Sequence, residues 1–173
     1  MKKIRVLIVD DNAVIRKIFS SKLDKEDDIQ VVGTAPDPYV AREKIVTLKP
    51  DVIILDIIMP RMDGLTFLGK LMEHFPLPVI IVSALTREGG DLALEAMDLG
   101  AVEVLSKPSE NYSINDMSVQ LANKIRAAAQ INISSSVKSR GEKIAKPISL
   151  EAKHSLLKTT NKIIALVALS TPH

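Results

Sequence analysis

The sequence predicts a parallel α/β fold, in which buried strands alternate along the chain with helices that cover the sheet. One observation is a set of short, mostly β-branched apolar runs at residues 4–9, 52–55, 79–82 and 102–105. A second is that the intervening segments repeat apolar residues every three or four positions, as helices that bury one face do. Short apolar runs of this kind are typical of parallel strands covered on both faces.

The remaining elements complete five strand–helix units within residues 1–130. Residues 29–33 form a less apolar strand pattern, which we expect at a sheet edge. Five units joined by right-handed crossovers predict a doubly wound, five-stranded parallel sheet with flavodoxin-like order 2-1-3-4-5 and helices on both faces. The expected apolar helix stripes are Val14, Ile15, Ile18, Phe19 and Leu23; Ala41, Ile45 and Leu48; Leu65, Leu68, Leu71, Met72 and Phe75; Leu92, Ala93, Ala96 and Met97; and Ile114, Met117, Leu121, Ile125 and Ala128.

Composition narrows the class of protein. A hydrophobic content of 46% is enough for a packed core, and the absence of cysteine excludes disulfide and thiolate chemistry. No apolar stretch has the length of a membrane span or the pattern of a signal peptide. We therefore expect a cytoplasmic location and no insertion into a membrane.

The charge distribution divides the chain into two parts. Residues 1–130 carry 16 Lys/Arg and 19 Asp/Glu, whereas residues 131–173 carry 7 and 2. The basic charges of the tail are spaced out with no aromatic residue among them, so a solvated linker is favoured over a nucleic-acid-binding segment. We expect a domain at 1–130, a flexible basic linker at 131–161 and an apolar strand at 162–173. Because that strand has no sheet of its own, self-association through the tail is expected.

Polar residues follow four of the predicted strands, at the point where each strand ends. Asp10 and Asp11 follow the first strand, Asp56 the third, Ser83 the fourth, and Lys107 comes directly after the fifth. Ligands of open α/β sheets bind beyond the carboxyl ends of the strands. The sequence therefore predicts that three carboxylates, a hydroxyl and an ammonium meet in one crevice.

Such a crevice suits phosphoryl transfer assisted by a divalent cation. Carboxylates crowded together need a cation to stay ionised, and Mg²⁺ prefers oxygen ligands, so Asp10, Asp11 and Asp56 are the expected metal ligands. Asp56, a single acid after a very apolar strand, is the expected phosphoryl acceptor, and Ser83 and Lys107 could bind the phosphoryl oxygens. Taken singly, Asp11 or Asn12 could instead cap the following helix. Asp63 is predicted to be such a cap.

These residues resemble the receiver domain of two-component response regulators. The matching motifs are Val9-Asp10-Asp11, the segment from Asp56 to Leu65, Ser83 and Lys107-Pro108. The resemblance implies that a histidine kinase phosphorylates Asp56, that Asp10 and Asp11 bind Mg²⁺, and that Ser83 and Lys107 sense the phosphoryl group.

A narrower resemblance is to the N-terminal regulatory domain of the chemotaxis protein-glutamate methylesterase. It is carried by residues 35–44, 82–90 and 94–103. It implies a chemotaxis-type histidine kinase as partner, and a linker leading to a catalytic domain that demethylates chemoreceptors. Residues 162–173 then read as a truncated first strand of that domain. Its serine turn lacks the family's glycines around Ser170, so we expect no methylesterase nucleophile and no esterase activity in this chain.

Two positions depart from the pattern of receivers, and other functions stay open. Val104 stands where receivers usually carry an aromatic residue, which puts the usual aromatic switch in question. Ile58 stands where the methylesterase subfamily often has Glu, and an apolar side chain there could shield the phosphoryl group from water. The alternatives are a stand-alone receiver, or the receiver of a transcriptional regulator whose effector is missing. A phosphohydrolase is disfavoured, since Ile58 replaces its second acid.

Overall fold

The structure, a computed structural model, describes residues 2–84, 89–107, 114–131 and 133. The chain divides into two units, Met1–Val137 and Lys138–His173, and every described residue belongs to the first. The expected strand at 162–173, the self-association through the tail and nearly all of the expected linker therefore lie outside the described residues.

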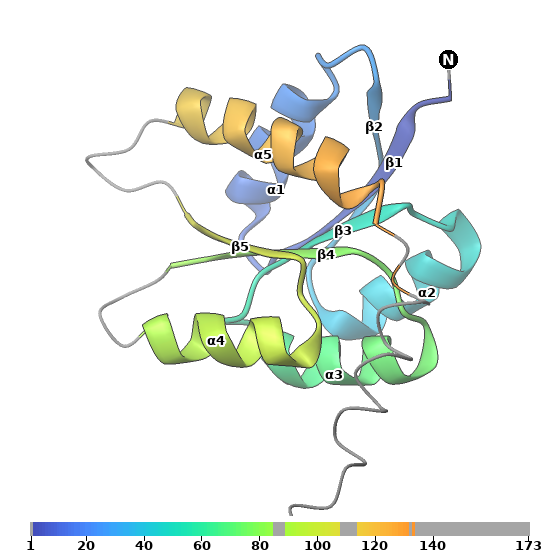
Figure 1. Cartoon of the computed structure of the whole chain (residues 1–173). Coiled ribbons are helices and arrows are strands. Elements are labelled where there is room, and N and C mark those ends of the chain that lie inside the picture. Colours follow the sequence, from blue (N-terminus) through green and yellow to red (C-terminus); the bar gives the residue numbers. More distant parts are fainter. Residues whose placement is uncertain (1, 85–88, 108–113, 132, 134–173) are drawn as a thin grey trace, which may run out of the picture. The chain divides into compact units, whose positions relative to one another are not determined.

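The first unit is a five-stranded parallel sheet with the predicted order β2-β1-β3-β4-β5 (Figure 1). The less apolar strand β2 lies at an edge, as expected from its sequence. The strands are β1 (Ile4–Val9), β2 (Ile29–Ala35), β3 (Val52–Leu55), β4 (Val79–Ser83) and β5 (Glu103–Ser106). The helices are α1 (Ala13–Leu23), α2 (Pro38–Leu48), α3 (Gly64–His74), α4 (Gly89–Leu99) and α5 (Ile114–Ala128).

Helices cover both faces of the sheet, α1 and α5 on one and α2, α3 and α4 on the other (Figure 1). Successive side chains of a strand point to opposite faces, so Ile8 packs with α1 and α5, whereas Leu7 and Val9 pack with α2 and α3. All are fully buried. Full burial of one such side chain stabilises the fold by roughly 1.5–3 kcal/mol. The double covering explains why the strands read as continuous apolar runs.

Three of the predicted helix stripes differ from the observed buried faces. In the stripe of α3, Phe75 is 52% exposed, because the helix ends at His74. Val14 is 65% exposed, because the buried face of α1 centres on Phe19 and Leu23 and a turn of 100° per residue places Val14 on the far side. In α4, Leu92 and Met97 are exposed and Ala96 alone of that stripe is fully buried. These three corrections concern helix faces and leave the sheet unchanged.

The chain beyond α5 returns to the opposite face of the sheet. Ile133 is buried in the same cluster as Ile45 of α2 and Leu71 of α3. No helix in the described part of the chain is both long and apolar enough to cross a membrane.

Candidate functional site

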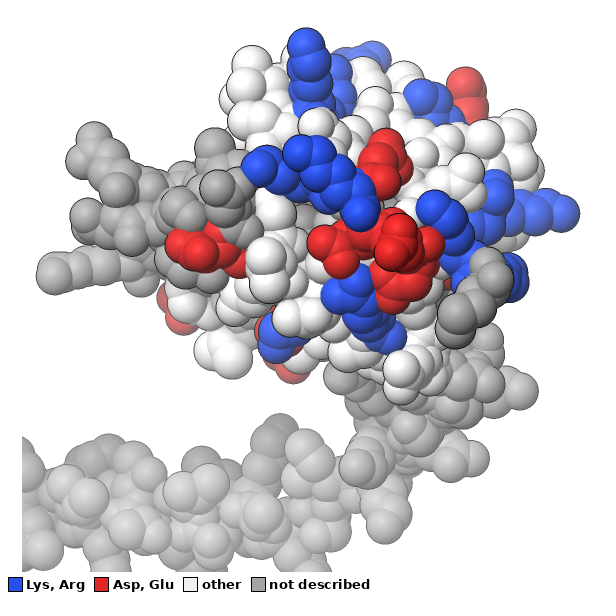
Figure 2. All heavy atoms as spheres, turned by 90° about the horizontal axis from the view of Figure 1, so that it is seen from above, with Lys and Arg blue, Asp and Glu red and all other residues white. Residues whose placement is uncertain are grey.

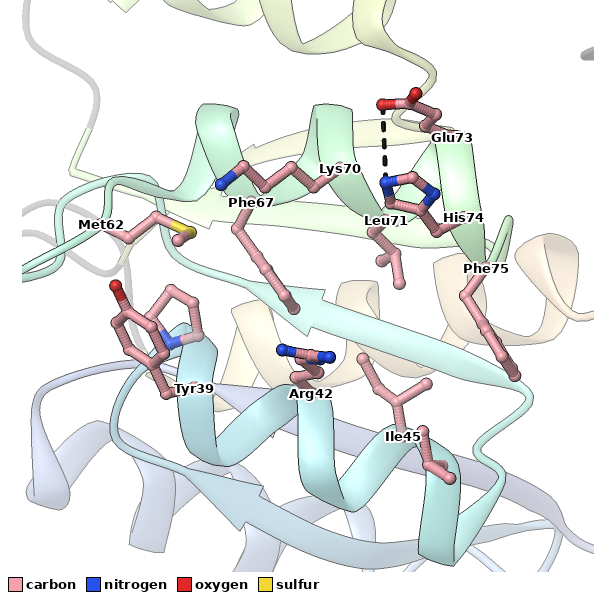
Figure 3. Close-up of a pocket in the computed structure, with 12 residues that line it drawn as sticks. Tyr39, Arg42, Ile45, Met62, Phe67, Lys70, Leu71, Glu73, His74 and Phe75 are labelled. Carbon is pink, nitrogen blue, oxygen red and sulfur yellow. Dashed lines mark ion pairs between the residues drawn. The ribbon is translucent and has the colours of Figure 1, made fainter.

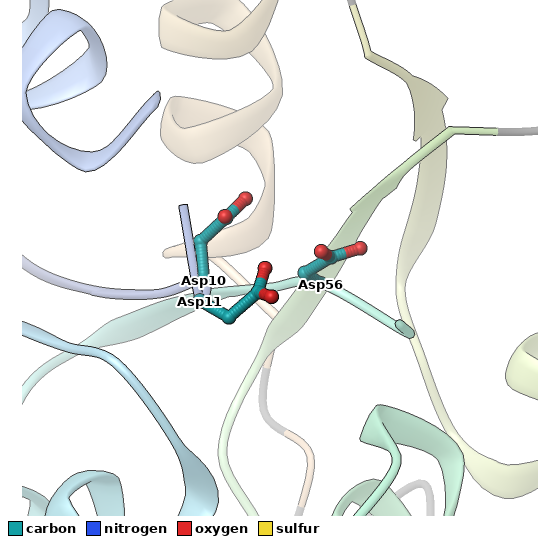
Figure 4. A group of neighbouring side chains, drawn as sticks. All are labelled: Asp10, Asp11 and Asp56. Carbon is teal, nitrogen blue, oxygen red and sulfur yellow. The ribbon is translucent and has the colours of Figure 1, made fainter. Parts of the chain in front are cut away.

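The register of the sheet brings the predicted acids together. Val9 of β1 pairs with Leu55 of β3, so Asp10 and Asp56 leave the sheet side by side, and the Asp56 amide donates to the Val9 carbonyl at 2.9 Å. One carboxyl oxygen from each of Asp10, Asp11 and Asp56 lies within 4.8 Å of the others (Figure 4). Asp10 and Asp56 are buried, and Asp11 is exposed. The predicted convergence of the three carboxylates is observed.

Lys107 follows the edge strand β5, and its side chain extends to this cluster. Its Nζ lies 2.6 Å from Asp56 Oδ2 and 2.7 Å from Asp10 Oδ2. The Lys107 amide donates to the Ser83 carbonyl at 2.8 Å, and Ser83 pairs with Ser106 across β4 and β5. The buried Ser83 thus helps to hold the backbone from which Lys107 extends. The ammonium bridges two carboxylates that would otherwise repel each other.

The electrostatics of the pair follow from burial and contact. Burial raises the pKa of Asp10, and the hydrogen bond from Lys107 opposes that rise without cancelling it. Burial alone would lower the pKa of Lys107, but its hydrogen bonds to Asp10 and Asp56 outweigh burial and raise that pKa. Lys107 is therefore positively charged at neutral pH.

The carboxyl oxygens of the cluster differ in the hydrogen bonds that they accept. Asp10 Oδ1 accepts from the Asn12 amide at 2.8 Å, whereas Asp56 Oδ1 accepts, from the described residues, only a long contact of 3.3 Å from the Ile58 amide. Asp11 extends its carboxylate toward solvent. A donor set made only of carboxylate oxygens suits a hard divalent cation, so the residues present fit Mg²⁺.

The helix cap next to the site is Asn12, which settles one of the alternatives left by the sequence. Asn12 Oδ1 accepts from the amides of Val14 and Ile15, so Asp11 does not cap α1 and its carboxylate stays available. At α3 the predicted cap is observed, since Asp63 Oδ1 accepts from the Thr66 amide. That bond is the first reason why the pKa of Asp63 is lowered.

Gly64 approaches the backbone of Asp56 so closely that no side chain fits. A Cβ on Gly64 would lie 2.0 Å from the Asp56 carbonyl oxygen and 2.8 Å from Ile57 Cα. The Gly64 amide donates to the Ile57 carbonyl at 2.7 Å. The start of α3 therefore rests directly on the segment that carries Asp56, a role that the sequence motif did not reveal.

The loop after Asp56 is also tied to α2, through residues that sequence reasoning missed. Arg61 adopts a left-handed backbone with φ of 69°. Its guanidinium pairs with the buried carboxylate of Asp37 and lies 5.3 Å from the centre of the Tyr39 ring. Asp37 in turn caps α2. No sequence signal links residues 24 positions apart in this way.

The two departures from the receiver pattern have clear places. Ile58 is 62% exposed in the loop that follows Asp56, so its side chain is not part of the core. Val104 is partly buried on β5 and packs against the cluster shared by α2, α3 and α4. A branched aliphatic side chain thus takes the place of the usual aromatic one.

The cluster of Asp10, Asp11 and Asp56 is distinct from a groove between two of the helices. The view from above shows one face of the molecule, on which acidic side chains gather near the middle with Lys and Arg side chains around them (Figure 2). A groove of about 720 Å³ lies between α2 and α3, lined among others by Tyr39, Ile45, Phe67 and Phe75 (Figure 3). The groove contains none of Asp10, Asp11 and Asp56, so we assign the phosphoryl chemistry to the cluster of these three acids.

The comparison with protein families agrees with this fold. Residues 6–118 match the response regulator receiver domain family, and the chain belongs to that family.

Individual relatives narrow the class to receivers of the methylesterase type, as the sequence resemblance predicted. The chain is 58% identical to a protein-glutamate methylesterase/protein-glutamine glutaminase of Syntrophus aciditrophicus, over 97% of this chain and 48% of the relative. It therefore spans about half the length of the curated relatives it matches.

Two solved structures share this fold, and one of them is the response regulator domain of a CheB protein. The response regulator domain of Thermotoga maritima CheB is 41% identical with a TM-score of 0.70, covering 76% of this chain and 99% of that domain. A CheX–CheY–BeF3–Mg complex from Borrelia burgdorferi matches at 28% identity and a TM-score of 0.61, over 73% of this chain and 89% of the matched chain.

Proposed function

We propose that this receiver is a phosphorylation switch that accepts a phosphoryl group on Asp56 from a histidine kinase. The observation that carries the proposal is the contact of Lys107 Nζ with both Asp56 and Asp10, beside the exposed carboxylate of Asp11. A permanent cation next to a buried carboxylate is placed to neutralise the charge that phosphorylation adds.

Asp56 is the acceptor because its carboxylate retains a weakly engaged oxygen. Both oxygens of Asp10 have short partners, Asn12 at 2.8 Å and Lys107 at 2.7 Å. In Asp56 one oxygen contacts Lys107, and among the described residues the other has only the long contact from Ile58. An oxygen without a strong hydrogen bond keeps more of its electron density for attack on phosphorus.

In the proposed transfer, Asp56 is the one group of this protein that forms a covalent bond to phosphorus. An Asp56 oxygen attacks the phosphorus of a phosphohistidine in line, the P–O bond forms, and the P–N bond breaks. The departing nitrogen keeps the electron pair of that bond and takes a proton from solvent. Lys107 then pairs with the phosphoryl oxygens, and Ser83, buried at the end of β4, is the hydroxyl that we propose binds one of them. Hydrolysis by water later returns phosphate and the free carboxylate.

Asp10, Asp11 and Asp56 would hold Mg²⁺ during this transfer. When bound, the ion supplies positive charge to the phosphoryl oxygens. The complex from Borrelia burgdorferi contains BeF3 and Mg together with a chain of similar fold, which supports a Mg²⁺ site in this fold.

The wider role that we propose is control of chemoreceptor demethylation within a longer protein. The relatives are named protein-glutamate methylesterases and are about twice as long as the matched segment. In this reading residues 131–161 are a linker, and a catalytic domain starts near residue 162. These names favour the methylesterase parent over a stand-alone or transcriptional receiver.

The test is phosphorylation by a small phosphodonor with Mg²⁺, followed by intact-protein mass spectrometry. The parent chain should gain one phosphoryl group, and Asp56→Asn should gain none, because the amide cannot attack phosphorus. Asp98→Asn, an exposed acid of α4, is the matched control and should label like the parent. A phosphoryl adduct on Asp56→Asn equal to that of the parent would remove Asp56 from the mechanism.

A further inference from the structure

The side chain of Arg16 donates hydrogen bonds to the backbone of Asp10 and Asp11, two acids of the cluster. Its Nη1 donates to the carbonyl oxygen of Asp10 at 2.7 Å and to that of Asp11 at 3.0 Å. Arg16 is the fourth residue of α1, and it is only partly exposed. One guanidinium nitrogen therefore holds two successive peptide units at the exit of β1.

The rest of the β1–α1 connection is held by shorter-range bonds. Asp10 Oδ1 accepts from the Asn12 amide, and the Asn12 carbonyl accepts from the Arg16 amide at 3.1 Å. These bonds fix Asp10 and Asn12, whereas the exposed carboxylate of Asp11 makes no side-chain hydrogen bond within the described part of the chain. Asp11 is held through its peptide carbonyl by Arg16.

We propose that Arg16 is a positioning residue for the divalent cation. By fixing the peptides of Asp10 and Asp11, it sets their carboxylates beside Asp56 before the cation arrives. Carboxylates that are already in position bind the cation more tightly, because the loop does not have to lose conformational entropy when the cation binds. Groups that orient metal ligands typically change metal affinity by 10- to 100-fold. The inference rests on the proposed Mg²⁺ site and adds a residue to it.

Whether loss of Arg16 weakens or tightens Mg²⁺ binding distinguishes a positioning role from an effect of its charge alone. A guanidinium near the carboxylates repels a second cation, so on charge alone the loss of Arg16 would tighten Mg²⁺ binding. Loss of positioning weakens Mg²⁺ binding instead. Lysine keeps the charge but offers a compact ammonium in place of the planar guanidinium, so Arg16→Lys isolates the geometry.

The experiment measures the Mg²⁺ dissociation constant by calorimetry for the parent chain, Arg16→Gln and Arg16→Lys. We expect Arg16→Gln to weaken binding by about tenfold and Arg16→Lys by a smaller factor of about three. The control is Lys17→Gln, which removes a neighbouring exposed cation that makes no ion pair or side-chain hydrogen bond within the described residues. It should leave the dissociation constant within about twofold of the parent, since surface charges are screened by salt.

A second measurement follows the loop without metal. Amide hydrogen exchange at Asp11 and Asn12 should speed up in metal-free Arg16→Gln while thermal unfolding still shows a folded protein. Mg²⁺ binding that is unchanged or tighter in Arg16→Gln, or equal in Arg16→Lys and the parent, would overturn the positioning role. If the parent chain itself bound no Mg²⁺, the proposed function would fail and this inference with it.

Discussion

Replacing Gly64 by alanine should damage both the stability of the receiver and the placement of Asp56. The new Cβ would meet the Asp56 carbonyl oxygen at 2.0 Å. Normal C···O contacts begin near 3.3 Å, so the two segments must separate by about 1.3 Å. Both contacting atoms belong to the backbone, and neither can rotate away as a flexible side chain would.

The size of the loss follows from two terms. Overpacking of this kind costs about 1–3 kcal/mol, and the hydrogen bond from Gly64 N to Ile57 O adds about 1 kcal/mol when it is stretched. A total loss of about 2–4 kcal/mol should lower Tm by roughly 10 °C in a domain of this size. Because Asp56 moves with the strained segment, labelling by a small phosphodonor should also fall.

Gly69 in the same helix is the matched control. A Cβ there meets only Leu99 Cδ2 at 3.7 Å, an ordinary contact. Gly69→Ala should raise the free energy of unfolding by about 0.5–1 kcal/mol through helix propensity, with normal labelling of Asp56. Thermal melts followed by circular dichroism compare the two variants. A Gly64→Ala protein that melts within about 2 °C of the parent would refute the contact argument.

Two further predictions concern Lys107 and Ile58. Lys107→Met leaves Asp10 and Asp56 buried without their cation and should lower the free energy of unfolding by about 2–4 kcal/mol at pH 7. The pKa of Asp10 is already above its ordinary value of 3.8 and should rise further without the Lys107 bond, so the variant should regain stability as pH falls from 7 toward 4.5. Ile58→Glu should speed phosphate release from phosphorylated Asp56, because a polar side chain can orient the attacking water. Val119→Glu, an exposed site on α5, should leave the rate unchanged.

The outcomes that contradict these two predictions are specific. For Lys107→Met, melts whose Tm falls steadily as pH is lowered would contradict the raised pKa of Asp10, since a group that binds a proton more tightly when folded stabilises the fold toward acid. For Ile58→Glu, a release rate equal to that of the parent would show that the exposed isoleucine has no kinetic role. Phosphate release is measured by the loss of the adduct over time in intact-protein mass spectra.

The sequence by itself determined the sheet order and the residues of the acidic cluster. Strands covered on both faces read as continuous apolar runs, and the rules of right-handed connection leave few orders for five such units. Carboxyl ends of parallel strands share one edge, so Asp10, Asp56 and Lys107 could be placed together without coordinates. Each of these inferences depends on a local pattern and one general rule of topology.

Only the tertiary structure decided which groups hold those residues in place. Arg16 reaches back to two carbonyl groups, Gly64 lies against the peptide of Asp56, and Arg61 pairs with Asp37 on another helix. The exposure of Val14 likewise depended on how α1 rotates against the sheet. The physical reason is that these contacts are set by distances between segments and by side-chain rotation, neither of which repeats along the sequence with a readable period.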